Sequence, residues 1–143
     1  MVVCRTIAQQ TIDNGKLIMV TGRRNMEDIF ATGKYNCRVE VTWKYEGDAN
    51  GMPDVATSTL MEEVQDALQA DFMKDPVAVL TGIYTGNGER NWVFYTRSLT
   101  IFGRKLNEDL LKFELLPLEF YAENDPEWNE YHEMREETEI ADE

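Results

Sequence analysis

The sequence predicts an α+β protein with one mainly antiparallel sheet, and three observations lead to this class. Two Asn-Gly pairs each lie between runs of β-branched and aromatic residues, the usual pattern of β-hairpins. Another segment alternates apolar and polar residues with the two-residue period of a half-buried strand. Two further segments have the three- and four-residue spacing of amphipathic helices. The length of 143 residues suits one domain, and a hydrophobic content of 43% suits one core.

The first hairpin is predicted at the N-terminal end of the chain, around Asn14-Gly15. Asn-Gly readily takes the two positive-φ positions of a type I′ turn. Residues 4–13 and 16–23 are therefore expected to be its two strands. Residues 25–35 have no firm period and are expected to form a loop or a short turn.

The central strand and the first long helix follow. The strand is predicted over residues 37–47, with an apolar face of Val39, Val41, Trp43 and Tyr45. Thr59 followed by Glu62 fits a capping box at the start of a helix. Asp75-Pro76 is expected to end this helix. Its apolar face consists of Met61, Val64, Leu68 and Phe72.

A second hairpin is predicted around Asn87-Gly88, and a two-residue turn there fixes which residues face each other. The expected pairs are Thr85–Arg90, Ile83–Trp92 and Thr81–Phe94. One face then carries Val79, Thr81, Ile83, Trp92, Phe94 and Thr96, and it is the more core-like. The other carries Leu80, Gly82, Tyr84, Val93, Tyr95 and Arg97. The pattern leaves open which face is uncovered, because a register error of one residue reverses the assignment.

The last predicted elements are a helix, a strand and a terminal helix. Ser98 is expected to cap the helix, in which Gly103 costs about 1 kcal/mol relative to alanine. The helix has an apolar stripe of Leu99, Phe102, Leu106, Leu110 and Phe113. In the strand over residues 114–123, Leu116, Leu118 and Phe120 share a face, and Pro117 favours a sheet edge.

The terminal helix is predicted to begin with Asp125 as N-cap and Pro126 as its first residue. Trp128 and Tyr131 then lie on one face, and Trp128 is expected to pin this helix to the body.

From residue 37 onward the predicted order is strand, helix, strand, strand, helix, strand. This is the order of the ferredoxin-like fold, a four-stranded antiparallel sheet with two helices on one face. The expectation is one α+β domain over residues 1–134, with an N-terminal hairpin and loop (1–35), a ferredoxin-like core (36–123) and a C-terminal helix (125–134). Residues 135–143 are expected to be a flexible acidic tail.

The net charge of −13 is unevenly distributed, because residues 123–143 carry −9 of it and the rest only −4. This charge disfavours nucleic-acid binding, which depends on attraction to phosphates. An acidic tail usually serves solubility, and in some proteins it meets a basic partner. No apolar run has the length of a membrane helix, so we expect a cytoplasmic protein with no membrane contact. We expect this protein to be a monomer or a weak homodimer.

Motifs of catalysis and metal binding are absent from the sequence. The two cysteines, Cys4 and Cys37, form no CxxC pair, and His132 is the only histidine. No G-x-S-x-G elbow, HExxH, P-loop or GxGxxG occurs. The strand RNWVFYTRS lacks the glycine pattern of an RNA-binding RRM motif. We therefore expect no cofactor, no metal and no catalytic residue.

Three functions remain open at this stage. The first is a binding or regulatory protein that meets a protein partner through its uncovered sheet face and C-terminal helix. The second is a small-ligand binder or enzyme with an arginine and aromatic pocket, since arginine beside aromatic rings suits planar or anionic ligands. The third is a homodimer through a sheet edge or face. The candidate surface residues are Arg90, Trp92, Tyr95, Arg97, Trp128, Tyr131 and His132.

Three stretches resemble the family known as domain of unknown function 695. They are VEVTWKYEGDANGMPD with the helix TLMEEVQDAL, the strand pair LTGIYTGNGERNWVFYT, and LEFYAENDPEWNEYHEM, which together span about residues 36–134. The resemblance implies a single α+β domain and no established catalytic residue. Some family members are joined to a domain similar to the bacterial regulator that inhibits ribonuclease E, which implies a regulatory or protein-binding role.

Overall fold

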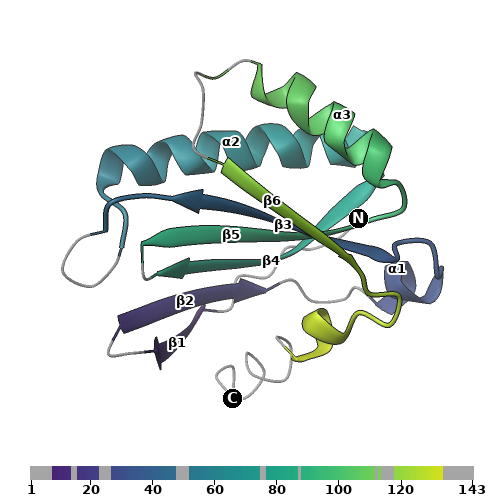
Figure 1. Cartoon of the computed structure of the whole chain (residues 1–143), viewed down its shortest axis with the longest axis horizontal. Coiled ribbons are helices and arrows are strands. Elements are labelled where there is room, and N and C mark those ends of the chain that lie inside the picture. Colours follow the sequence, from purple (N-terminus) through teal and green to yellow (C-terminus); the bar gives the residue numbers. More distant parts are fainter. Residues whose placement is uncertain are drawn as a thin grey trace.

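One antiparallel sheet of six strands organises the protein, with strand order β1-β2-β4-β5-β3-β6 (Figure 1). The computed structural model describes residues 8–13, 16–22, 27–47, 52–74, 77–86, 88–111, 113 and 118–133. The α+β class is therefore confirmed. The strands are β1 (Ala8–Asp13), β2 (Lys16–Gly22), β3 (Cys37–Lys44), β4 (Ala78–Gly86), β5 (Glu89–Thr96) and β6 (Leu118–Asn124). The helices are α1 (Glu27–Ala31), α2 (Val55–Lys74) and α3 (Leu99–Leu110).

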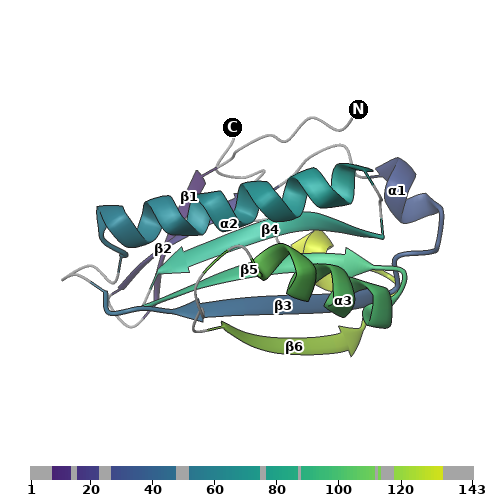
Figure 2. The same ribbon diagram turned by 90° about the horizontal axis from the view of Figure 1, so that it is seen from above.

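The helices α2 and α3 lie on the same face of the sheet, which we call the helix-covered face (Figure 2). Apolar side chains of β3, β4 and β5 meet the apolar stripes of both helices there. The rings of Phe72, Phe94 and Phe102 contact one another at this junction, with centroids 5.2–5.8 Å apart. The fully buried part of this core includes Val41, Met61, Val64, Leu68, Trp92, Phe94 and Phe102.

Both predicted hairpins are confirmed by strand pairing. Strand β1 pairs with β2 from Ala8↔Thr21 to Asp13↔Lys16, and β4 pairs with β5 down to Gly86↔Glu89. Gly88 has φ +82°, as a tight turn requires. Asn14 and Gly15 lie outside the described residues. Part of the segment 25–35 is the short helix α1, where a loop or turn was the expectation.

Helix α2 begins four residues before the predicted start. Thr59 lies inside the helix, so the predicted capping box is wrong. The cap is Asp54, whose carboxylate accepts a hydrogen bond of 2.7 Å from the amide of Thr57. The amide and the side-chain hydroxyl of Thr57 hold the pKa of Asp54 below its ordinary value. The helix therefore starts after Asp54 and not after Thr59, because Asp54 caps its first turn.

Helix α3 begins as predicted, with the Ser98 hydroxyl accepting a hydrogen bond of 3.2 Å from the amide of Ile101. Phe102 and Leu106 are buried in the core, and Leu110 and Phe113 pack against it. Leu99 is 49% exposed, so the apolar stripe does not extend to the first helical residue.

Replacing Ser98 by alanine is expected to reduce the free energy of unfolding by about 1 kcal/mol, because one amide in the first turn of α3 loses its acceptor. Urea denaturation measures the change. Replacing Thr100, which is exposed on the same turn, by alanine provides the control and should change stability by less than about 0.5 kcal/mol. Equal effects of the two substitutions would contradict the capping role.

A β-bulge in β4 corrects the predicted faces of the second hairpin. Thr85↔Arg90 and Ile83↔Trp92 are paired as expected, but Phe94 faces Leu80 and not Thr81. The register shifts between Leu80 and Gly82, so Thr81 is the extra residue. Its hydroxyl bonds the carbonyl oxygen of Val93 at 3.3 Å. The sequence pattern assumes an unbroken period of two and therefore assigns Val79 and Leu80 to the wrong faces.

Strand β6 lies at one edge of the sheet, beside β3, in agreement with the expectation from Pro117 (Figure 2). The register places Phe120 opposite Val41, on the helix-covered face. Tyr121 faces Glu40 and lies on the other face, which we call the open face. Leu116 lies outside the described residues. The fold thus leaves two surfaces to consider, the open face and the edge strand β6.

Candidate functional site

The segment 125–133, which we call the C-terminal turn, covers part of the open face together with α1 (Figure 1). Trp128 is only 1% exposed and stacks on Tyr95 with ring centroids 4.5 Å apart and an interplanar angle of 23°. Its indole N–H donates to the carbonyl oxygen of Tyr35 at 2.7 Å. Phe30 and Tyr131 complete the cluster, with centroids 5.5 and 5.3 Å from Trp128. The predicted pinning role of Trp128 agrees with this geometry.

The helical part of the C-terminal turn begins later than predicted. Residues 129–133 are helical, whereas Pro126 lies in a turn closed by a 3.0 Å hydrogen bond from the Trp128 amide to the Asp125 carbonyl. Trp128 has φ +57°, a left-handed conformation that costs about 1–2 kcal/mol for a residue with a side chain. Burial of the indole offsets this strain. The residue directly before the helix is Trp128, so Asp125 does not hold the predicted N-cap position and Pro126 is not the first helical residue.

Asp125 connects the C-terminal turn to the sheet by hydrogen bonds. Its carboxylate accepts from the Tyr95 hydroxyl at 2.8 Å and from the amides of Asn129 at 3.0 Å and Glu130 at 3.3 Å. Burial acts to raise the pKa of Asp125, but these donors hold it below its ordinary value. Burial and the bond to Asp125 raise the pKa of Tyr95, so this phenol stays protonated. The Tyr95–Asp125 hydrogen bond therefore connects β5 to the C-terminal turn.

Arg38 is the buried cation of the open face, with a side chain only 9% exposed. Its two terminal nitrogens donate to Glu40 and to Glu123, the latter at 2.6 Å. Burial alone would lower the pKa of Arg38, but Glu123 raises it, so the guanidinium remains charged. Both terminal nitrogens already donate to carboxylates, so this arginine is not a ready site for an anionic ligand.

Glu130 is a half-buried acid of the C-terminal turn whose pKa lies above its ordinary value. Burial raises the pKa, and the hydrogen bond from the Tyr84 hydroxyl only partly offsets this. Within the described part of the chain, its buried Oε1 and the buried Nε of Arg38 have no hydrogen-bond partner. The charged form of Glu130 is therefore disfavoured in the folded state.

Replacing Glu130 by glutamine is expected to flatten the dependence of stability on pH. Because the pKa of Glu130 is raised in the folded state, its contribution to stability is complete below the ordinary pKa near 4.5. This contribution is lost as pH rises through the folded-state pKa. Glutamine has no charge to desolvate. Between about pH 4 and pH 7, the thermal midpoint of the variant should therefore rise by a few degrees relative to that of the wild type. Thermal unfolding measures this, with Glu127→Gln, at an exposed acid of the same segment, as the control. Parallel curves of wild type and Glu130→Gln would contradict the burial of a disfavoured charge.

The predicted surface residues divide between the two faces of the sheet. Trp92 is fully buried on the helix-covered face, where its indole donates to Gln65 at 2.9 Å. Arg90 lies on that face too and donates to the Thr85 hydroxyl at 2.8 Å. Arg97 is exposed beyond the end of β5.

The other four predicted residues, Tyr95, Trp128, Tyr131 and His132, come together on the open face. The His132 ring contacts Phe30 and Tyr131, with centroids 5.1 and 5.7 Å away. These rings pack against one another and fill the space between them. The seven residues do not line one pocket.

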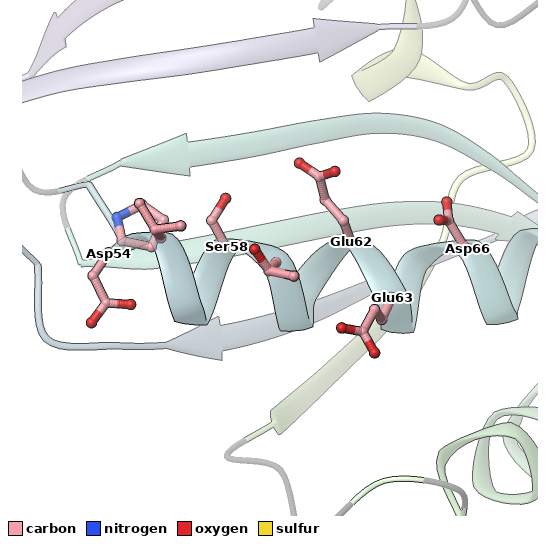
Figure 3. Close-up of a pocket in the computed structure, with 8 residues that line it drawn as sticks. Asp54, Ser58, Glu62, Glu63 and Asp66 are labelled. Carbon is pink, nitrogen blue, oxygen red and sulfur yellow. The ribbon is translucent and has the colours of Figure 1, made fainter.

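An open depression lies instead beside the first turns of α2, and its polar lining is acidic (Figure 3). Glu62 and Asp66 point to one side of the helix and Glu63 to the other. Among the residues that the structure describes, no group of three histidine, cysteine or acidic side chains could hold a metal ion. The lining is Pro53, Asp54, Val55, Ser58, Thr59, Glu62, Glu63 and Asp66.

The edge strand β6 exposes aromatic and charged side chains together. Phe120 and Tyr121 are each 54% exposed, and no residue of β6 is buried. On the open face, Glu119 pairs with Lys44 at 3.3 Å and Glu123 pairs with Arg38. We call Arg38, Glu40, Lys44, Glu119 and Glu123 the charged strip. The sequence interpretation missed this surface, although an alternating strand after a proline, LEFYAEN, was the available signal.

Fold and surface together define a small α+β protein with a partly covered open face and an exposed edge strand that carries both aromatic and charged side chains. The family model described as "Family of unknown function (DUF695)" matches residues 7–134, so the chain belongs to this family. No curated protein and no solved structure matches the chain. Within the described residues, no helix has the length and apolar character needed to cross a membrane.

Proposed function

We propose that this protein binds another protein and has no catalytic activity of its own, and that β6 receives the partner. The observation that carries this proposal is the exposure of β6, a seven-residue strand at a sheet edge with two aromatic side chains more than half exposed. Such an edge is a template for pairing with another strand unless it is protected. Addition of an extended peptide to a sheet edge is a common mode of protein recognition.

Backbone geometry supports this use of β6. In an antiparallel pair, alternate residues of a strand direct their N–H and C=O groups toward the neighbouring strand. Strand β3 pairs with β6 from Cys37↔Asn124 to Trp43↔Leu118. Every second residue of β6 therefore directs its N–H and C=O groups toward β3, and the residues between them direct theirs away from the sheet. A partner strand would satisfy these groups over the whole length of β6.

The division of the predicted ligand residues favours a partner over a small ligand. A small-molecule site needs a concave pocket with convergent polar groups. Trp92 and Arg90 lie on the helix-covered face, while Tyr95 and Trp128 stack on the open face. These side chains do not converge on one cavity. The edge strand presents an extended surface, which suits a polypeptide.

We propose that β3 to β6, with α2 and α3, form a ferredoxin-like unit to which β1 and β2 add a hairpin at one edge. The strand order β4-β5-β3-β6 supports this assignment. We also propose a cytoplasmic location and a monomeric or weakly dimeric state, which leaves β6 accessible.

Selection of random extended peptides against the full chain tests the proposed function. Selected peptides are expected to bind the wild type and to lose at least about tenfold in affinity for the double variant Phe120→Lys and Tyr121→Lys, because lysines protect natural sheet edges. Leu111→Lys is the matched control, since Leu111 is 82% exposed outside β6. Selected peptides that bind both variants equally, or a selection without binders, would overturn the proposal.

A further inference from the structure

We propose that the segment bound by β6 is an extended strand with basic side chains on the open face and apolar side chains on the helix-covered face. This inference rests on the proposed function and specifies the chemistry of the partner. It follows from the two sides of β6, which differ in character because successive side chains point to opposite faces of a sheet.

The open-face side of β6 is acidic and incompletely neutralised. Glu119, Tyr121 and Glu123 project there, opposite Thr42, Glu40 and Arg38 of β3. In the charged strip, three carboxylates are shared between two cations, because Arg38 serves both Glu40 and Glu123. The whole chain, with the charged strip included, carries a net charge of −13. Lysine or arginine in a partner strand would therefore meet unbalanced negative charge.

The opposite side of β6 offers an apolar contact in line with the core. Leu118 packs against the helix-covered core, and Phe120 follows on the same face at 54% exposure. A branched apolar side chain on a partner strand would cover this ring, as aromatic and β-branched residues do in cross-strand pairs. The partner strand that fits β6 thus alternates basic and apolar residues.

The same charges act against a second copy of this chain as the occupant. In the longest antiparallel self-pairing of β6, which is centred on Tyr121, Glu119 of each copy lies opposite Glu123 of the other. Like charges directly opposite each other in a sheet are destabilising. Charged side chains on an edge strand are one of the ways in which natural sheets avoid edge-to-edge association. Charge therefore selects a basic partner strand over β6 itself.

Three synthetic seven-residue peptides test this inference: KVKVKVK, its glutamate counterpart EVEVEVE, and the block peptide KKKKVVV. Offset by one residue along β6, KVKVKVK places lysines opposite Glu119, Tyr121 and Glu123 and valines opposite Phe120 and Ala122. Titration into the labelled full chain, followed by amide shifts, gives affinity and location together. KVKVKVK is expected to bind at β6 at least about tenfold more tightly than EVEVEVE and to exceed KKKKVVV, because only alternation matches both sides of the strand.

Two double variants distinguish binding of the peptide at β6 from nonspecific attraction of a basic peptide to an acidic protein. Glu119→Gln with Glu123→Gln is expected to weaken KVKVKVK about fivefold. Glu63→Gln with Asp66→Asn removes the same charge from the exposed side of α2 and should change affinity by less than about twofold. Equal weakening by both pairs, or amide shifts confined to α2, would overturn the inference.

The remaining outcomes separate this inference from the proposed function. If EVEVEVE or an uncharged TVTVTVT binds β6 as tightly as KVKVKVK does, the inference of a basic partner strand is wrong. The proposed binding of a partner strand at β6 would then still hold. If no peptide of any charge shifts the β6 amides, both proposals fail. If light scattering shows a dimer that Phe120→Lys dissociates, the occupant is a second copy and the partner assignment is overturned.

Discussion

Replacing Trp128 by alanine is expected to lower the free energy of unfolding by about 3–5 kcal/mol, as for other buried aromatic residues. The indole stacks on Tyr95, contacts Phe30 and Tyr131, and donates to the Tyr35 carbonyl. Its loss leaves a cavity between the C-terminal turn and the sheet. For a chain of this size we expect a decrease of roughly 10–15 °C in the thermal midpoint.

Two variants make this prediction specific. Phe120→Ala, at a ring that is 54% exposed, should cost less than about 1 kcal/mol. Trp128→Gly should be at least as stable as Trp128→Ala, because glycine adopts the φ of +57° without the steric cost that alanine incurs. An unchanged midpoint in Trp128→Ala would contradict the pinning role and make the tryptophan a surface residue.

Replacing Asp125 by alanine is expected to cost about 2–4 kcal/mol. The buried Tyr95 hydroxyl loses its acceptor at 2.8 Å, which carries a desolvation cost of about 1–3 kcal/mol. The amides of Asn129 and Glu130 lose their cap at the same time, worth about 1 kcal/mol. Chemical denaturation at neutral pH, where the lowered pKa keeps Asp125 charged, measures this loss.

A double-mutant cycle with Tyr95→Phe isolates the hydrogen bond of this pair. The double variant should be more stable than the sum of the single effects predicts, by at least about 1 kcal/mol, because it leaves no buried hydroxyl unpaired. Strict additivity would show that Asp125 acts only as a cap. The wild type should also lose stability as pH falls through the lowered folded-state pKa of Asp125.

Local sequence signals predicted most of the fold. The two Asn-Gly turns, the alternation in β3 and the stripes of α2 and α3 led to the correct element types, because each is governed by contacts close in sequence. The bulge at Thr81 was not predictable in this way, since one extra residue in β4 leaves no mark on the apolar pattern. The start of α2 was misplaced because Asp54 and Thr59 both offer a side-chain cap.

The candidate site was less predictable, because its contacts join distant parts of the chain. Arg38 and Glu123 are 85 positions apart, and Tyr95 and Asp125 are 30 apart. Helical periodicity correctly placed Trp128 beside Tyr131 but gave no sign of the positive φ. Alternation along β5 correctly assigned Trp92 and Tyr95 to opposite faces, but only the packing of α2 and α3 shows which of these faces is covered.

The arrangement gives the sheet two different faces and an exposed edge strand, β6. The C-terminal turn fills part of the open face with rings, while β6 keeps its backbone and two aromatic side chains accessible. Under the proposed function, stability and recognition depend on separate residues. Trp128 and Asp125 variants should change the midpoint, whereas Phe120 and Tyr121 variants should change binding alone.

Hydrogen exchange of individual β6 amides, with and without KVKVKVK bound, tests the central claim most directly. In the free protein, amides directed toward β3 should exchange slowly and alternate ones quickly. Binding is expected to slow the fast amides of Leu118–Asn124, so that protection becomes continuous along the strand. An alternating pattern that persists at saturation, or protection that appears only on α2, would contradict partner recognition by strand addition to β6.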